Sequence, residues 1–144
     1  MPASQASLEP RKFLLALVAD LTQDINYFPY FKAAHRELHL FFWGLKQTSK
    51  YRPFVDDFLF DTNGNFPHCE QIDELLQEFQ LSGVLSRPNP TYRFNDICIS
   101  RSPSGEQFKG NLSPEQEETY KEILELFKRN LGVLKPKPGM LLTD

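Results

Sequence analysis

Two histidines four residues apart are the first candidates for chemistry. His35 and His39 would share one face of a helix, a spacing at which two imidazoles can bind one zinc ion. Glu37 would point away from that face, and no glutamate directly follows His35 as a zinc protease requires. His68 and Cys69 could join the pair only through tertiary contact. The sequence therefore predicts no metal, and it leaves a small enzyme built on His35, His39 and Cys69 as an alternative.

The polar stretch from Leu59 to Glu70 is a second candidate, because it partly matches a calcium-binding EF-hand loop. Asp61, Asn63 and Gly64 stand where the third, fifth and sixth positions of such a loop would be. The first position, which should supply a carboxylate, is Leu59. Asx side chains also cap their own backbone, and glycine accepts a positive φ. The stretch is therefore predicted to be an ordinary Asx turn.

Nucleophilic chemistry is only weakly indicated. Cys69 lies near the start of a predicted helix, where the helix dipole could lower its pKa, but its sequence neighbour His68 would generally point elsewhere. The sequence contains no glycine-rich phosphate loop and no serine in a nucleophile elbow. We therefore predict that the protein is not an enzyme and uses no cofactor.

Hydrophobic periodicity predicts the elements that position these residues. Apolar side chains recur at helical spacing in several segments, and a stretch rich in β-branched and aromatic residues indicates a hairpin. The predicted helices run from about 9 to 22, from 31 to 46, from Pro53 over a short stretch, from 67 to 80 with Gly83 as its end, and from Ser113 to Gly132. The predicted strands are 84–85 and 91–100, and 101–111 is predicted to be a polar loop.

The chain of 144 residues fits one domain. The expected fold is mainly α with a small β-hairpin, an α+β class. One domain is expected over residues 1–134, followed by a flexible tail rich in proline and lysine over 135–144.

Between Pro53 and Ser100, a helix end, a glycine turn and a returning strand follow one another, in the residues Leu76, Phe79, Ser82, Gly83, Val84, Leu85, Tyr92 and Phe94. With these features the segment resembles a winged helix-turn-helix domain. The resemblance implies a winged-helix-like core with additional N- and C-terminal helices. It also implies that the helix at 67–80 occupies the position that usually enters the DNA major groove.

The charge on that helix argues against such insertion. From residue 53 to 80 there are seven acids and no Lys or Arg, a local net charge of −7 against −3 for the whole chain. Like charges repel, and DNA phosphates are densely spaced. The acids are either a solvated helix face or a docking face for a basic partner, in which case the contact residues are Glu70, Asp73, Glu74 and Glu78.

Positive charge is found elsewhere, on the predicted second helix and on the hairpin. The residues that could contact nucleic acid are Lys32, Arg36, Lys46, Lys50, Arg52, Arg87 and Arg93. DNA binding through this helix and wing, as in a transcriptional regulator, is the alternative to a solvated surface.

Aromatic content favours an interaction module. Thirteen Phe, five Tyr and one Trp are more large apolar surface than a small monomer easily hides. We therefore predict a non-enzymatic regulatory or protein-interaction module that forms a homodimer or binds another protein. The chain has no run of about 18 apolar residues and no secretory signal, and its two cysteines are expected to be free. A cytoplasmic protein without a membrane partner is expected.

Overall fold

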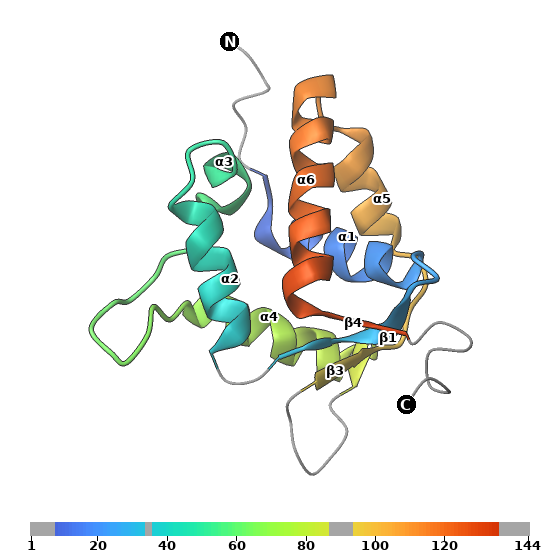
Figure 1. The fold of residues 1–144 in the computed structure, drawn as a ribbon, viewed down its shortest axis with the longest axis horizontal. Coiled ribbons are helices and arrows are strands. Elements are labelled where there is room, and N and C mark those ends of the chain that lie inside the picture. The colour runs from blue at the N-terminus through green and yellow to red at the C-terminus, as the bar shows by residue number, and fades with distance from the viewer. Residues whose placement is uncertain (1–7, 34–35, 87–93, 136–144) are drawn as a thin grey trace, which may run out of the picture.

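The computed structural model describes residues 8–33, 36–86 and 94–135. Within these ranges the chain forms six helices and a four-stranded antiparallel sheet (Figure 1). This confirms the α+β class, and the predicted two-stranded hairpin is part of a larger sheet. The helices are α1 (Pro10–Thr22), α2 (Glu37–Lys46), α3 (Arg52–Val55), α4 (Glu70–Leu81), α5 (Pro103–Gly110) and α6 (Pro114–Leu131). The strands are β1 (Tyr27–Lys32), β2 (Leu85–Ser86), β3 (Phe94–Ile97) and β4 (Gly132–Leu134), in the order β2-β3-β1-β4.

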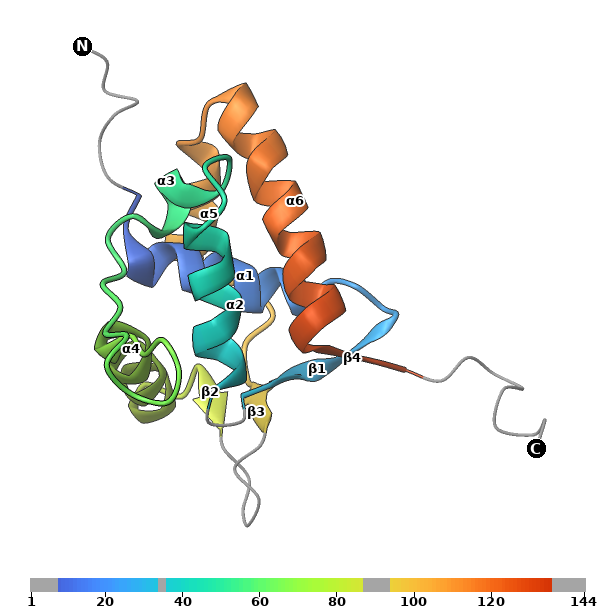
Figure 2. The same cartoon turned by 60° about the vertical axis from the view of Figure 1, so that its left-hand side comes forward.

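Helix α1 is the centre of the core. Eight of its residues are buried, because α3, α5, α6 and the sheet all pack around it. In both views α1, α2, α5 and α6 stand on one side of the sheet (Figures 1 and 2). The ring of Phe31 in β1 meets the ring of Phe127 in α6, with centroids 5.5 Å apart, so the inner face of the sheet closes the core.

The predicted helix over 31–46 is wrong in its first part. Residues 27–32 form β1, the second-last strand of the sheet, and α2 begins only at Glu37. The pattern was obscured by Pro29, which lacks the N–H that a ladder needs. The β1–β4 register shifts between Tyr27 and Phe31, so the proline lies in an irregular stretch of the pairing and is tolerated there.

The predicted loop at 101–111 is also wrong, because it contains α5. The hydroxyl of Ser102 accepts a hydrogen bond from the backbone N–H of Gly105, and Pro103 stands in the first helical turn, where a missing N–H costs nothing. Gly105 lets α5 approach α1 closely: a Cβ at this position would lie 3.0 Å from the Cα of Ala16. Proline and glycine here are helix-start and packing residues rather than loop residues.

We expect Gly105→Ala to destabilise the protein and Gly44→Ala to stabilise it. Alanine at 105 must push α5 away from α1, which costs about 1–3 kcal/mol, more than its helix propensity returns. A Cβ on Gly44 in α2 would meet nothing within 4 Å, so that variant gains up to about 1 kcal/mol of helix propensity. Chemical denaturation of both variants measures the difference, and shifts of the same sign would contradict the packing argument.

Several local predictions are confirmed. Ser113 and Gln116 form the reciprocal capping box of α6, Gly83 takes a φ of +84° after α4, and β2 pairs antiparallel with β3. Helix α4 begins at Glu70 rather than at residue 67. The predicted turn at 87–90, the start of the returning strand and tail residues 136–144 lie outside the described residues. Lys135, the first residue of the predicted tail, is described, and its backbone N–H donates a hydrogen bond to the Asn26 carbonyl.

None of the helices in the described ranges combines the length and the apolar character needed to cross a bilayer.

Candidate functional site

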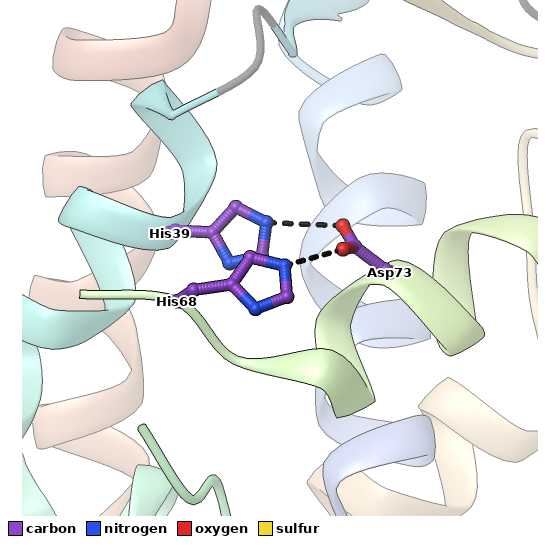
Figure 3. A group of neighbouring side chains, drawn as sticks. All are labelled: His39, His68 and Asp73. Carbon is purple, nitrogen blue, oxygen red and sulfur yellow. Dashed lines mark hydrogen bonds and ion pairs between the residues drawn. The ribbon is translucent and has the colours of Figure 1, made fainter. Parts of the chain in front are cut away.

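Three titratable side chains from separate stretches of the chain meet between α2 and α4 (Figure 3). His39 lies in α2, His68 precedes α4, and Asp73 lies in the first turns of α4. His39 Nε2 is 3.0 Å from one carboxylate oxygen of Asp73, and His68 Nε2 is 2.6 Å from the other. The two imidazole rings stack with centroids 4.5 Å apart. We call His39, His68 and Asp73 the His–Asp–His cluster.

The loop before α4 sets the position of His68. Asp61 and His68 exchange two backbone hydrogen bonds of 2.7 and 3.0 Å, which close the loop between them. The Asp61 carboxylate accepts the backbone N–H of Asn63, as the predicted Asx turn requires. The side chain of Asp61 therefore caps its own turn. The group of potential metal-ligating side chains that the described residues bring together includes neither Asp61 nor Glu70.

His39 is the buried member of the cluster, and its protonation state follows from its neighbours. Its side chain is only 4% exposed. The backbone N–H of Cys69, which can only donate, points at His39 Nδ1 over 3.1 Å. Nδ1 must therefore accept, and the proton of the neutral ring lies on Nε2, from which it is donated to Asp73. His39 thus caps the start of α4 and holds the Asp73 carboxylate.

The other two members are open to solvent. The His68 and Asp73 side chains are 37% and 52% exposed. His68 also lines a surface hollow of about 500 Å³ together with Leu59, Phe60, Asp61, Glu70 and Gln71. Solvent therefore reaches one side of the cluster, while the other side is a hydrogen-bonded part of the core.

The cluster has the donor types of a zinc site but the wrong proton arrangement. Two imidazoles and a carboxylate are common zinc ligands, and the ligand atoms lie within 4.8 Å of one another. A histidine that binds metal through Nε2 normally donates the proton on Nδ1 to an acceptor. Here Nδ1 of His39 faces the Cys69 N–H donor. Metal binding would therefore sacrifice the hydrogen bond that caps α4, and the residues do not fit a metal centre.

We expect zinc to leave the stability of the protein unchanged. A site with a Kd of about 1 µM would raise the free energy of unfolding by about 2.7 kcal/mol at 100 µM free zinc. Thermal unfolding with and without 100 µM Zn²⁺, compared with His68→Ala, measures this contribution. A zinc-dependent rise in the midpoint that His68→Ala abolishes would show that His39 gives up its bond to Cys69.

Cys69 is not placed for nucleophilic chemistry. Its side chain is fully buried, and this burial raises the pKa of the thiol, although nearby backbone hydrogen bonds oppose the shift. The helix-dipole effect considered from the sequence is therefore outweighed. Cys98 is exposed, and both cysteines are free thiols. His35, the predicted partner of His39, lies outside the described residues.

A second polar cluster joins α1 to α5 and α6. Asp20 accepts hydrogen bonds from the Tyr120 hydroxyl at 2.7 Å and from Lys109 Nζ at 2.8 Å. Burial strongly raises the pKa of the Tyr120 phenol. Burial opposes the charge on Lys109, but the hydrogen bonds and negative charges of Asp20 and Glu106 together outweigh it, and the Lys109 pKa is raised. Each of these polar groups already has a hydrogen-bond partner within the cluster, so we infer that the cluster serves to hold α1, α5 and α6 together.

The predicted acidic face of α4 is partly engaged within the chain. Asp73 belongs to the His–Asp–His cluster, and Glu78 forms an ion pair with Arg11. Within the described residues, Glu70 and Glu74 have no ion pair, and both are exposed. Only half of this face therefore remains available to a partner.

The predicted basic residues are divided between the two ends of α2. Lys32 and Arg36 precede this helix, whereas Lys46, Lys50 and Arg52 lie at or beyond its last residue, about 15 Å away. The three at the far end are engaged: Lys46 donates to the Phe58 carbonyl, Lys50 pairs with Glu122 at 2.7 Å, and Arg52 donates to the Lys46 carbonyl. Arg87 and Arg93 lie outside the described residues.

The outer face of the sheet carries a row of aromatic side chains. The rings of Phe28 and Tyr30 stack at 5.4 Å, and Tyr30 meets the ring of Phe94 edge to face at 5.5 Å. Lys135 Nζ lies 5.9 Å from the Phe28 ring centroid. Among the described residues, these three rings meet each other and Lys135, and they meet no aromatic ring of a helix. Sequence reasoning missed this row because it placed residue 30 before a helix.

No family model, curated protein or solved structure matches this chain, so its function has to be argued from its own residues.

Proposed function

We propose that the protein is a non-enzymatic protein-interaction module whose binding surface is the outer face of the sheet. The observation that carries this proposal is the aromatic row of Phe28, Tyr30 and Phe94, whose rings meet one another and, within the described residues, meet no aromatic ring of a helix. Contiguous aromatic surface on a small protein is typical of an interface, because its burial against a partner removes apolar area from water.

The same strands separate the core from this surface. Phe31 in β1 and Asn95 in β3 are fully buried, while the alternate residues Tyr30, Lys32, Phe94 and Asp96 are half-buried on the opposite side. A strand sends alternate side chains to opposite faces. The outer aromatics are therefore not needed to fill the core, which the inner residues already close.

The residues with catalytic potential support a non-enzymatic role. The His39 proton is donated to Asp73, its other ring nitrogen is occupied by the Cys69 N–H, and the Cys69 thiol is buried. The His–Asp–His cluster is thus used to join α2 to α4. We assign it a structural role.

We retain the winged-helix-like core as part of the proposal. It is supported by the order of elements: α3 and α4 are followed directly by the hairpin β2–β3, and β1 joins this hairpin as a third strand. In this scheme α4 is the helix at the recognition position. Because that helix carries no basic residue, the interface is placed on the sheet instead.

Photo-crosslinking tests the proposal. A benzophenone amino acid in place of Tyr30 is expected to form protein adducts in cells that express the chain. The same group in place of Glu118, which is exposed on α6, is the matched control and should form few. Equal labelling from both positions, or none from position 30, would refute an interface on the sheet.

Nucleic acid is the second candidate partner, because Lys32 and Lys135 lie beside the aromatic row. Bases stack on aromatic rings, and lysines neutralise phosphates. This candidate requires binding to a single-stranded or duplex oligonucleotide that weakens steeply with salt. It also requires that Lys32→Ala weakens this binding, and no binding at low salt would eliminate it.

A further inference from the structure

The outer face of the sheet has a defined arrangement of four side chains, set by the β1–β3 register. Tyr30 is paired with Asp96, and Lys32 with Phe94. Directly opposed residues in an antiparallel pair point to the same face. The intervening pair, Phe31 and Asn95, points inward and is fully buried. Tyr30, Asp96, Lys32 and Phe94 are therefore the four corners of one patch on the outer face.

The two charges of the patch lie on one diagonal. Diagonal neighbours across an antiparallel pair are about 7–8 Å apart, and within the described residues neither Lys32 nor Asp96 belongs to an ion pair. Tyr30 and Phe94 occupy the other diagonal and touch edge to face. The patch therefore offers one positive charge, one negative charge and an aromatic pair between them.

This pattern is self-complementary. In a two-fold symmetric interface, a residue i that contacts j on the second copy also has j contacting i. A two-fold axis that runs between two facing sheets along the Tyr30–Phe94 diagonal carries each charged corner onto the other. The interface then contains two equivalent contacts between Lys32 of one copy and Asp96 of the other. Each aromatic side chain on the axis meets the same residue of the other copy.

We propose that the outer face of the sheet pairs two copies of this chain, with Lys32 of each copy opposite Asp96 of the other. This inference rests on the proposed function and names the partner. A different protein whose surface carries charges of only one sign could pair with Lys32 or with Asp96, but not with both. A second copy of this chain offers an opposite charge to each of them. Phe28, stacked on Tyr30, extends the apolar part of the same interface.

Exchanging the charges at positions 32 and 96 tests the pairing, because the proposal predicts both a loss of dimerisation and its recovery. Light scattering and sedimentation at about 10–100 µM protein should show a dimer for the unmodified chain. Lys32→Glu and Asp96→Lys should each weaken dimerisation at least about tenfold, because each places two like-charge contacts in the interface. Glu118→Lys, an exposed charge change on α6, should leave the dimer unchanged.

The decisive samples are the mixture and the double variant. In an equimolar mixture of Lys32→Glu and Asp96→Lys, both cross-copy contacts again join opposite charges, so a mixed dimer should form from two chains that fail to pair alone. The double variant Lys32→Glu/Asp96→Lys should also dimerise. Circular dichroism of each single variant should match the unmodified chain, which confirms that the fold is intact.

Failure of this inference is distinct from failure of the proposed function. A monomer at 100 µM, or two single variants that stay monomeric when mixed, would overturn the self-pairing. If the benzophenone at position 30 still forms adducts with another protein, the interaction surface stands with a different occupant. If the monomer instead binds an oligonucleotide and Lys32→Glu abolishes that binding, the face belongs to nucleic acid and both proposals fall.

Discussion

Replacing His39 with alanine is expected to lower the free energy of unfolding by about 3–5 kcal/mol. The change leaves the buried N–H of Cys69 without its acceptor, which costs about 1–3 kcal/mol. It also removes a hydrogen bond to a carboxylate and leaves a cavity where a nearly fully buried ring stood. Few single replacements outside the apolar core should cost as much, because the ring serves two elements at once.

Two other variants separate the roles of this ring. Asparagine at position 39 places an acceptor oxygen near the former Nδ1, so His39→Asn should keep the cap on Cys69 and be about 1–2 kcal/mol less destabilised than His39→Ala. His68→Ala removes a more exposed ring and a hydrogen bond to Asp73 that is open to solvent, and should cost about 1 kcal/mol or less. Urea denaturation of the three variants measures these differences. Equal losses for the two alanine variants would mean that His39 does not cap α4.

The His–Asp–His cluster shows which contacts local sequence patterns leave out. The sequence points to His39 but pairs it with His35, because helical periodicity indicates only which residues lie close together on the same helix. Its partners in the fold, His68 and Asp73, are 29 and 34 positions further along the chain, brought in by the Asp61–His68 bridge. Asp73 is indistinguishable by residue type from its acidic neighbours on α4, so no local signal could separate it from a solvated face.

Signals that lie within one turn of the chain were mostly predicted correctly, whereas strand β1, which is fixed by pairing with distant strands, was not. The capping box of Ser113 and Gln116 and the positive φ of Gly83 depend on residues within one turn. Strand β1 depends on β3 and β4, which lie far along the chain, and its proline looked like a break. Helix α5 did have a local signal, Ser102 followed by Pro103, but the nearby Gly105 made the segment look like a loop.

Phe13 should be the most sensitive apolar position in the chain. Its ring, fully buried in α1, meets Phe42, Phe54, Phe108 and Tyr120, with centroids 5.4 to 6.3 Å away. These neighbours come from α2, α3, α5 and α6. One side chain therefore contacts four other helices, and the loss of its volume cannot be repaired by the movement of a single element.

Phe13→Ala should consequently lower the free energy of unfolding by about 4–5 kcal/mol, at the upper end for a buried phenylalanine, because the site cannot collapse. Phe13→Leu keeps most of the volume and should cost about 1.5 kcal/mol, which keeps the test measurable if the alanine variant does not fold. Phe28→Ala on the outer face of the sheet is the matched control, with an expected cost near 1 kcal/mol in the dilute monomer, where mainly its stacking on Tyr30 is lost. A loss at position 28 as large as that at position 13 would show that the outer aromatics belong to the core. Such a result would remove the physical basis for placing an interface on the sheet, because residues that hold the monomer together are not free to meet a partner.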